Sequence, residues 1–425
     1  MQLLQKYREY YQSQFVKNLF TLTSGTAIAQ LIPIIASPFL SRLFTPAEFG
    51  IFANFLSITS ILMVFYSGKF EYAIVLPERH EEAINIVGLT ILLSLISTIL
   101  VSLLFLFTGS YLGELLKYDR VTAWLWLTPI SALLANIYFI FNEWCIRKNN
   151  YLVLSKNKIT NTSSITLSSL VFGVAKIRKG LIWGQILGQV ATVFFAIKRF
   201  VIDDFYLLKF ISLRKIKYFA GRYIEFFKFY MPGQLVNTVS GQLPVFLFTM
   251  QFGIFKVGLF SLADRVFGVA MSFIGTAIRD VYKQKAAVEF REKGHCYGVF
   301  KNVALLLSVV SAVIFSILFF ASPFLFPLVF GKEWTEAGQI ARILCIMYMF
   351  GFISVPLSYT LIIAERQRYE FIWQISFFLF TFIPLLIGIK ANDFRLSLIL
   401  LAGGRCLSYV FQFVLSLIIA RGKTA

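Results

Sequence analysis

Several residue types that build metal centres and soluble enzymes are scarce in this chain of 425 residues. Histidine occurs only as His80 and His295, both in polar connectors, which excludes a histidine metal centre within a membrane. The four cysteines are far apart and lack the paired spacing of metal or redox sites, so we expect free thiols. The sequence has no GxxxxGKS or GxxxxGKT phosphate loop, and we expect neither an ATPase nor a bound cofactor.

Charged residues are also few, at 14% of the chain, whereas hydrophobic residues make up 58%. This composition leaves too little polar sequence for a soluble domain of ordinary size. Apolar runs account for most of the chain, and each is long enough for a helix of about 20 residues to cross a bilayer. We expect twelve transmembrane helices, near residues 19–41, 48–68, 84–107, 121–143, 158–175, 180–198, 230–252, 257–279, 299–321, 338–363, 370–389 and 396–420.

The net charge of +19 is distributed in a way that predicts orientation. Lysine and arginine concentrate in the N-terminal tail and in every second connector, so the positive-inside rule predicts that both termini are cytoplasmic. A nucleic-acid partner is not expected, because the basic residues cluster at helix ends and not on a solvated face. The first apolar run lacks a small-x-small cleavage pattern, so we expect it to remain as a helix.

The longest and most basic connector divides the chain into two halves of six predicted spans. We expect a cytoplasmic tail (1–18), an N-lobe (19–198), a basic cytoplasmic connector (199–229), a C-lobe (230–420) and a short cytoplasmic C-terminal tail (421–425). The segment 49–52 (FGIF) resembles 257–260 (VGLF), which indicates an internal duplication. Six helices per half give the repeats the same orientation, so the predicted all-α membrane fold has pseudo-two-fold symmetry along the membrane normal.

Local motifs also carry information. The segment Thr45-Pro46-Ala47-Glu48 has the form of a capping box and predicts that the second helix starts there. The segments that resemble a known family are 41–50 (SRLFTPAEFG), 68–74 (GKFEYAI), 81–83 (EEA), 258–263 (GLFSLA) and 330–338 (FGKEWTEAG). They are similar to the polysaccharide transport family, the O-antigen and oligosaccharide flippases of the multidrug/oligosaccharidyl-lipid/polysaccharide (MOP) flippase superfamily. The similarity covers nearly the full chain.

This resemblance implies a flippase that moves undecaprenyl-pyrophosphate-linked repeat units of O-antigen, capsule or exopolysaccharide from the cytoplasmic to the periplasmic leaflet. It also implies a multi-pass protein of the bacterial cytoplasmic (inner) membrane. The implied partners are the lipid-linked oligosaccharide and membrane lipids, with a polysaccharide polymerase and a chain-length regulator as candidate protein partners.

Two ionisable residues lie deep in the predicted eighth helix. Arg265 is about 12 Å from its outer end, and such a buried charge usually faces a cavity, a partner or water. It is a candidate cation for pyrophosphate or acidic sugars, and the alternative is a packing seam in which another helix neutralises it. Asp264 points about 100° away around the helix and forms either a structural ion pair or a site for a coupling ion.

Arg405 and Gln189 form a second candidate pair. Arg405 lies near the middle of the twelfth predicted helix, and Gln189 in the sixth is its proposed repeat counterpart. A basic group in one lobe and an amide in the other would suit an anionic substrate, and the alternative is an interhelical hydrogen-bond cluster.

Four further basic residues lie at predicted helix ends. Arg42 and Arg342 are near outer ends, where they either extend to the headgroups or meet substrate. Lys69 and Arg279 are at inner mouths, where they either anchor the helices through surface ion pairs or meet an incoming pyrophosphate.

Two rival functions remain at this point. A drug or cation antiporter of the same superfamily would be expected to present acidic groups, whereas the deep charges here are two arginines and one aspartate. A membrane glycosyltransferase or polysaccharide polymerase commonly needs a sizeable outer loop with catalytic groups, and the predicted outer connectors are short. The sequence therefore predicts a transporter and not an enzyme, and leaves open whether substrate, proton or sodium gradients drive it.

Overall fold

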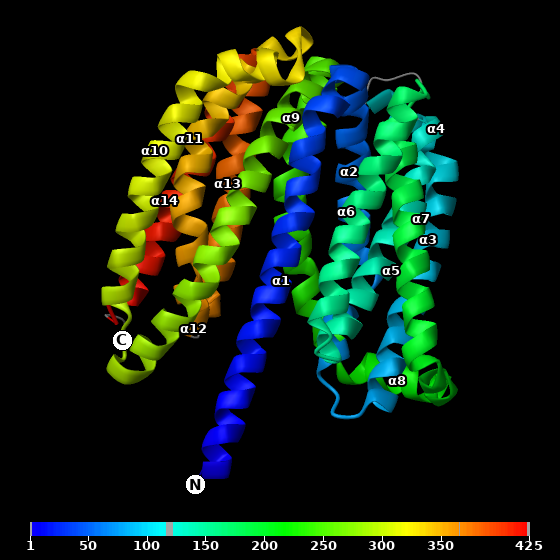
Figure 1. Cartoon of the computed structure of the whole chain (residues 1–425). Coiled ribbons are helices and arrows are strands. Elements are labelled where there is room, and N and C mark those ends of the chain that lie inside the picture. Colours follow the sequence, from blue (N-terminus) through cyan, green and yellow to red (C-terminus); the bar gives the residue numbers. More distant parts are fainter. Residues whose placement is uncertain (1, 116–121, 365, 423–425) are drawn as a thin grey trace. The chain divides into compact units, whose positions relative to one another are not determined.

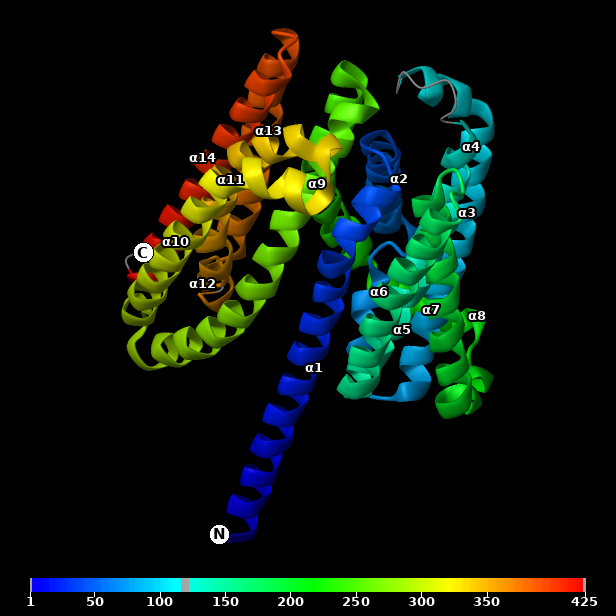
Figure 2. The ribbon, with the colours of Figure 1, turned by 45° about the horizontal axis from the view of Figure 1, so that its top comes forward.

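The computed structural model describes residues 2–115, 122–364 and 366–422, and within these ranges the regular elements are helical and no strand occurs. The helices, shown in Figures 1 and 2, are α1 (Gln2–Leu43), α2 (Pro46–Tyr66), α3 (His80–Leu115), α4 (Thr122–Leu125), α5 (Leu127–Arg147), α6 (Tyr151–Val174), α7 (Gly180–Asp204), α8 (Leu213–Arg222), α9 (Met231–Lys293), α10 (Tyr297–Phe330), α11 (Thr335–Leu357), α12 (Tyr359–Ile363), α13 (Gln367–Lys390) and α14 (Phe394–Ala420). Short 3-10 turns are η1 (Phe70–Val75), η2 (Phe205–Phe210) and η4 (Lys332–Trp334), and η3 (Phe226–Tyr230) is a π-helical turn.

The all-α membrane architecture is confirmed. Ten stretches of the described residues are long and apolar enough to cross a membrane. Two of the twelve predicted spans are not separate among these ten. The run 158–175 lies in α6, which is long enough but carries many serine, threonine and asparagine residues, and 230–252 and 257–279 are parts of the single long helix α9.

Helix α9 is interrupted at Gly253, where the backbone is not helical (φ 82°, ψ 168°). A positive φ of this size favours glycine, because other side chains would be strained there. The kink therefore replaces the outer loop that the sequence analysis expected between the two spans.

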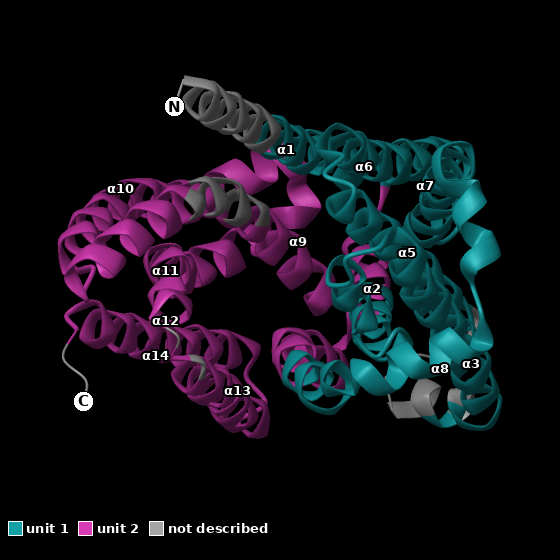
Figure 3. Cartoon of the chain, turned by 90° about the horizontal axis from the view of Figure 1, so that it is seen from below, with its two compact units in different colours: residues 1–43, 55–235 teal, residues 44–54, 236–425 magenta. Residues whose placement is uncertain are grey.

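The chain divides into two compact units, coloured separately in Figure 3. Unit 1 comprises residues 1–43 and 55–235, and unit 2 comprises residues 44–54 and 236–425. Within unit 1, α6 packs between α1 and α7, and α5 packs on α7. Within unit 2, α11 packs against α10 and α14, and α13 packs against α14.

The basic connector 199–229 is largely helical. Helix α7 continues to Asp204 and is followed by η2, α8 and η3. In α8, Ile216 and Phe219 are buried against unit 1, whereas the basic residues Arg214, Lys215 and Lys217 are exposed. This helix therefore holds the connector against α3 through its apolar face.

Equivalent hydrogen bonds in the two units support the internal duplication. In unit 1 the hydroxyl of Ser131 donates to Gln189 Oε1 over 2.9 Å, and in unit 2 the hydroxyl of Ser354 donates to Gln412 Oε1 over 2.9 Å. Both pairs are separated by 58 residues, and both join corresponding helices, α5 to α7 and α11 to α14. The repeat counterpart of Gln189 is therefore Gln412, and the predicted pairing with Arg405 was wrong by about two helical turns.

The start of α2 follows the predicted capping box. The Thr45 backbone N–H donates to Glu48 Oε2 over 3.0 Å, and the Glu48 N–H donates to Thr45 Oγ1 over 3.4 Å. The first helical residue is Pro46, whose missing N–H costs nothing at that position. The first residues of α2, up to Asn54, belong to unit 2.

Two glycines allow α2 and α9 to cross closely within unit 2. A Cβ added to Gly50 would lie 2.0 Å from the Ile254 carbonyl oxygen, and one added to Gly258 would lie 1.7 Å from the Pro46 carbonyl oxygen. Each glycine thus faces the carbonyl one helical turn before the other glycine. These are the glycines that the repeat comparison aligned, so the crossing joins equivalent points of the two repeats.

We predict that Gly258→Ala destabilises the protein, because the added methyl group overlaps a backbone carbonyl that cannot rotate away. Overpacking of this kind typically costs about 1–3 kcal/mol. Thermal unfolding of the purified protein in detergent measures the effect. The matched control is Gly241→Ala in the same helix, where no atom lies within 4 Å of the new Cβ. Equal unfolding midpoints for the two variants would contradict the close crossing.

Candidate functional site

A group of polar side chains in the membrane-spanning part of unit 2 surrounds Asp264. The hydroxyl of Tyr348, on α11, donates to Asp264 Oδ1 over 2.8 Å and lies 3.1 Å from the Asp264 carbonyl oxygen. Arg405, on α14, is close enough for its charge to act on the Asp264 carboxylate. Three helices, α9, α11 and α14, therefore bring a carboxylate, a phenol and a guanidinium together.

Packing around Arg405 fixes its position. Its side chain is buried, and its guanidinium carbon lies 5.5 Å from the ring centroid of Phe377 on α13. Next to it, a Cβ on Gly404 would lie 1.9 Å from the Phe380 carbonyl oxygen, so α14 passes very close to α13. The Arg405 Nε is buried and has no hydrogen-bond partner among the described residues. The cation is thus held in place by apolar packing, and the described residues leave its Nε–H donor unused.

Arg265 differs from its neighbour Asp264. Its side chain is half-buried, and no hydrogen bond or ion pair joins it to any residue that the structure describes. Arg265 is therefore a cation at membrane depth that other described side chains do not neutralise.

Gln189 lies in unit 1 and is buried. Its amide oxygen accepts from Ser131, as described above, so this side chain belongs to an interhelical hydrogen bond between α5 and α7. The neighbouring helix α6 carries Lys158, whose Nζ donates to the Thr26 hydroxyl over 2.9 Å. In unit 1, therefore, Gln189 and Lys158 each form a hydrogen bond with a side chain of a neighbouring helix.

Lys69, one of the predicted mouth residues, is buried in a tight turn. Its backbone φ is 64°, and its Nζ lies 3.4 Å from Glu71 Oε1, while the Ser67 hydroxyl donates to the other oxygen of the same carboxylate. Burial and the adjacent Tyr230 raise the pKa of Tyr72, whose ring lies 5.9 Å from the Lys69 ammonium. The structure therefore places Lys69 in an internal ion pair.

The other predicted basic residues lie at separate places. Arg279 lies over the ring of Tyr359, with 5.4 Å between guanidinium carbon and ring centroid. Arg42 is exposed at the end of α1. Arg342 is exposed on α11 and lies 4.6 Å from the ring centroid of Phe319. Within unit 2, Arg342 therefore does not belong to the Asp264 cluster.

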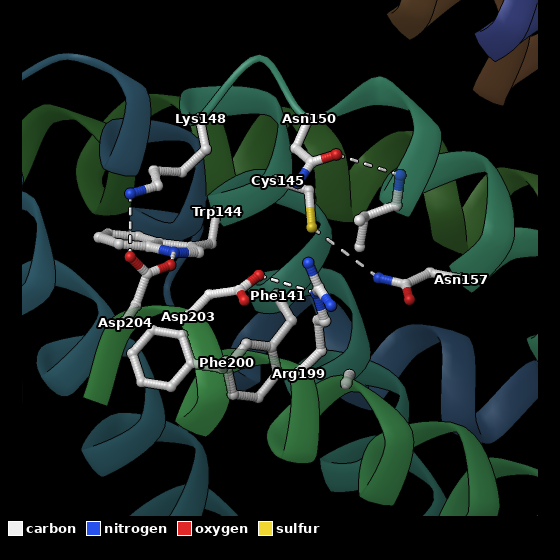
Figure 4. A pocket seen from close by; sticks show the side chains of 12 residues that line it. Phe141, Trp144, Cys145, Lys148, Asn150, Asn157, Arg199, Phe200, Asp203 and Asp204 are labelled. Atoms are coloured by element: carbon white, nitrogen blue, oxygen red, sulfur yellow. Dashed lines mark hydrogen bonds and ion pairs between the residues drawn. The ribbon is translucent and has the colours of Figure 1, made fainter.

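A small cavity in unit 1, shown in Figure 4, is closed by a fixed polar network. The Trp144 Nε1–H donates to Asp204 over 2.8 Å, Lys148 pairs with the same carboxylate over 2.9 Å, and Arg199 pairs with Asp203 over 2.7 Å. Its volume of about 50 Å³ suits one or a few waters and is far below the roughly 300–1,000 Å³ of ligand pockets. We interpret this network as a structural connection that holds the end of α5 against α7.

Comparison with known proteins gives the family. A family profile described as "Polysaccharide biosynthesis protein" matches residues 39–339, which is more than half of the chain. The chain belongs to this family. No curated protein matches the sequence of this polysaccharide biosynthesis family member. The match confirms the family resemblance in the sequence analysis.

Solved structures confirm the MOP fold of this polysaccharide biosynthesis protein. It is similar to the lipid II flippase MurJ in an inward closed conformation (TM-score 0.69, 12% identity, 96% of this chain and 90% of that chain). It is also similar to an inward-facing multidrug resistance MATE family transporter (0.65, 12%, 95% and 95%). A third similar structure is a MOP superfamily transporter from Pyrococcus furiosus described as having a binding pocket of reverse polarity (0.63, 15%, 96% and 97%). At these identities the comparison shows the fold alone.

Tyr348 was not predicted as a polar partner of Asp264. A tyrosine inside a long apolar run has the pattern of a core residue, and only the packing of α11 against α9 brings its hydroxyl to Asp264. Lys158 was likewise placed at the edge of a predicted span, although in the structure it lies two turns inside α6.

We predict that the effects of Asp264→Asn and Arg405→Gln on stability are strongly non-additive. Each single variant leaves the other group without the opposite charge that acts on it, and groups coupled in this way typically interact by about 0.5–3 kcal/mol, whereas the double variant removes both charges. Thermal unfolding of the wild type, both single variants and the double variant in detergent provides the cycle. Additive losses would show that the two charges do not interact.

Proposed function

We propose that this protein is a membrane flippase for oligosaccharides linked to a polyprenyl diphosphate, the precursors of O-antigen, capsule or exopolysaccharide. The main support for this proposal is Arg265, a cation within a membrane span that has no hydrogen-bond or ion-pair partner among the described side chains. An arginine at such depth costs at least about 2.5–3.5 kcal/mol on insertion scales, so an unneutralised one is expected to serve a ligand or a water-filled path.

The chemistry of a guanidinium suits the diphosphate. Its planar set of donors forms paired hydrogen bonds with phosphate oxygens and remains charged at all physiological pH values. Family membership supports a role in polysaccharide biosynthesis, and the fold supports transport. The polyprenyl chain can stay in lipid while the charged and sugar-bearing part crosses through protein.

The Asp264 cluster supplies a second element of the proposal. A carboxylate held by Tyr348 and near Arg405 can gain or lose a proton or a monovalent cation, so it is a candidate site for coupling transport to an ion gradient. Alternating exposure of the site to the two leaflets would then follow from movement of the two lobes, as in other transporters built from repeats. The proposed location is the bacterial cytoplasmic membrane with both termini inside.

A drug or cation antiporter is the second candidate, and the charges of unit 2 argue against it. A cationic drug near Asp264 would meet the arginines Arg265 and Arg405 beside this carboxylate. Anionic substrates therefore fit this unit better. No described observation favours a glycosyltransferase or a polymerase.

We expect deletion of the gene in its native host to abolish the surface polysaccharide and to leave complete lipid-linked repeat units on the cytoplasmic leaflet. Analysis of surface glycan and mass spectrometry of the lipid-linked pool measure both. Unchanged glycan with increased drug sensitivity would favour the antiporter. Single repeat units that reach the periplasm without forming chains would instead favour a polymerase.

We predict that Arg265→Ala reduces surface glycan in complementation at least tenfold at normal protein level, because it removes the unpaired cation. Arg265→Lys keeps a point charge without the paired geometry and should restore part of the activity. The matched control is Lys390→Ala, which removes an exposed cation at the end of α13. If both Arg265→Ala and Arg405→Ala support normal glycan, the assigned substrate path is wrong.

A further inference from the structure

A large groove in unit 2 remains outside the site described above. It has a volume of about 790 Å³, within the range of roughly 300–1,000 Å³ typical of ligand pockets. Its walls come from α11 and α14, with Phe319 of α10 at one side. The residues that line it and carry the argument are Arg342, Arg395, Ile346, Ile399, Ala402 and Gly403.

One end of the groove is cationic. Arg342 is the eighth residue of α11, two turns from its start, and Arg395 is the second residue of α14, so both arginines lie in the first half of their helices. Neither has an ion-pair partner among the described residues. The carboxylate at this end, Glu336, is already paired with Lys256. The two arginines therefore leave a net positive charge for an anion.

The other end of the groove is apolar and open. Ile346 and Ile399 are 44% and 48% exposed, and Ala402 and Gly403 follow one turn further along α14. A Cβ added to Gly403 would have no atom within 4 Å, which shows that the space in front of this glycine is free. Beyond Arg342 and Arg395, the groove continues as an apolar trough, and the described residues that line this part carry no charge.

Cationic side chains at one end of the groove and apolar side chains along the rest complement an amphiphile with an anionic head and one long apolar chain. We propose that the groove binds a polyprenyl diphosphate, with the diphosphate on Arg342 and Arg395 and the first part of the isoprenoid chain along Ile346, Ile399 and Gly403. This inference rests on the proposed function and specifies where the lipid part of its substrate or product is held. Two separate arginines on two helices match a diphosphate better than the single charge of a phosphodiester.

The position of the groove gives it a specific place in the transport cycle. In the predicted orientation, α11 and α14 both begin at the outer side, so Arg395 lies at the outer end of the groove and Arg342 about two turns inside the start of α11, both in the outer half of the membrane. A diphosphate held there has already crossed the membrane. The groove would then retain the translocated lipid, whereas Arg265 deeper in the same unit would act during the crossing.

Binding of farnesyl diphosphate to the full-length protein in detergent tests the proposal by calorimetry. All titrations use an Arg265→Ala background, so that the deep arginine does not contribute. We expect Arg342→Ala with Arg395→Ala to weaken binding at least tenfold, and the matched control Lys390→Ala to leave it unchanged. Inorganic pyrophosphate, which lacks the chain, should bind at least tenfold more weakly than farnesyl diphosphate.

Filling the trough provides an independent variant. Gly403→Leu should fold, because free space surrounds the new side chain, and should weaken binding of farnesyl diphosphate but not of pyrophosphate. Unchanged farnesyl diphosphate binding in the double arginine variant would overturn the proposal, as would equal competition by phosphatidylglycerol, which would indicate an ordinary phospholipid site. Gene deletion tests the flippase function separately. Loss of glycan on deletion, together with unchanged farnesyl diphosphate binding in the double arginine variant, would contradict the proposed lipid site but not the flippase function.

Discussion

The cost of a charge in a hydrocarbon layer governs how this structure uses its few ionisable residues. In a medium without water, an unpaired charge is unfavourable by several kcal/mol, so membrane helices place charges against partners or cavities. Asp264 with Tyr348 and Lys158 with Thr26 follow this rule within their units. Arg265, inside α9, has no such partner among the described residues, which makes it a strong candidate for contact with an anionic ligand.

Close helix packing is the second requirement, because apolar surfaces gain little by leaving lipid for protein. Small residues at helix crossings permit the backbones to approach, which increases van der Waals contact. Gly50 and Gly258 do so between α2 and α9, and Gly404 does so between α14 and α13 next to Arg405. The last case links packing to chemistry, since the same approach that joins two helices also holds a buried guanidinium in place.

The sequence allowed prediction of the helical membrane fold, the family, the capping box and the duplication, because each depends on local composition or spacing. The register of the repeats could not be obtained in this way. Apolar helices resemble one another, and only the matching bonds of Ser131 with Gln189 and Ser354 with Gln412 showed which turns correspond. The break between the predicted spans 230–252 and 257–279 was placed correctly but was expected to be a loop, and the structure has a kink at Gly253 there.

The candidate site was partly predictable for the same reason. A charge in an apolar run is visible in the sequence, so Asp264, Arg265 and Arg405 could be named as candidates. Their partners could not be named, because these depend on which helices pack against one another in the folded protein. Arg342 and Arg395 illustrate the limit. Each looks like a headgroup anchor at a helix end, and only the space that α11 and α14 leave between them converts two separate anchors into the end of one groove. Charge alone thus suggested where polar chemistry occurs, and packing determined which charges act together.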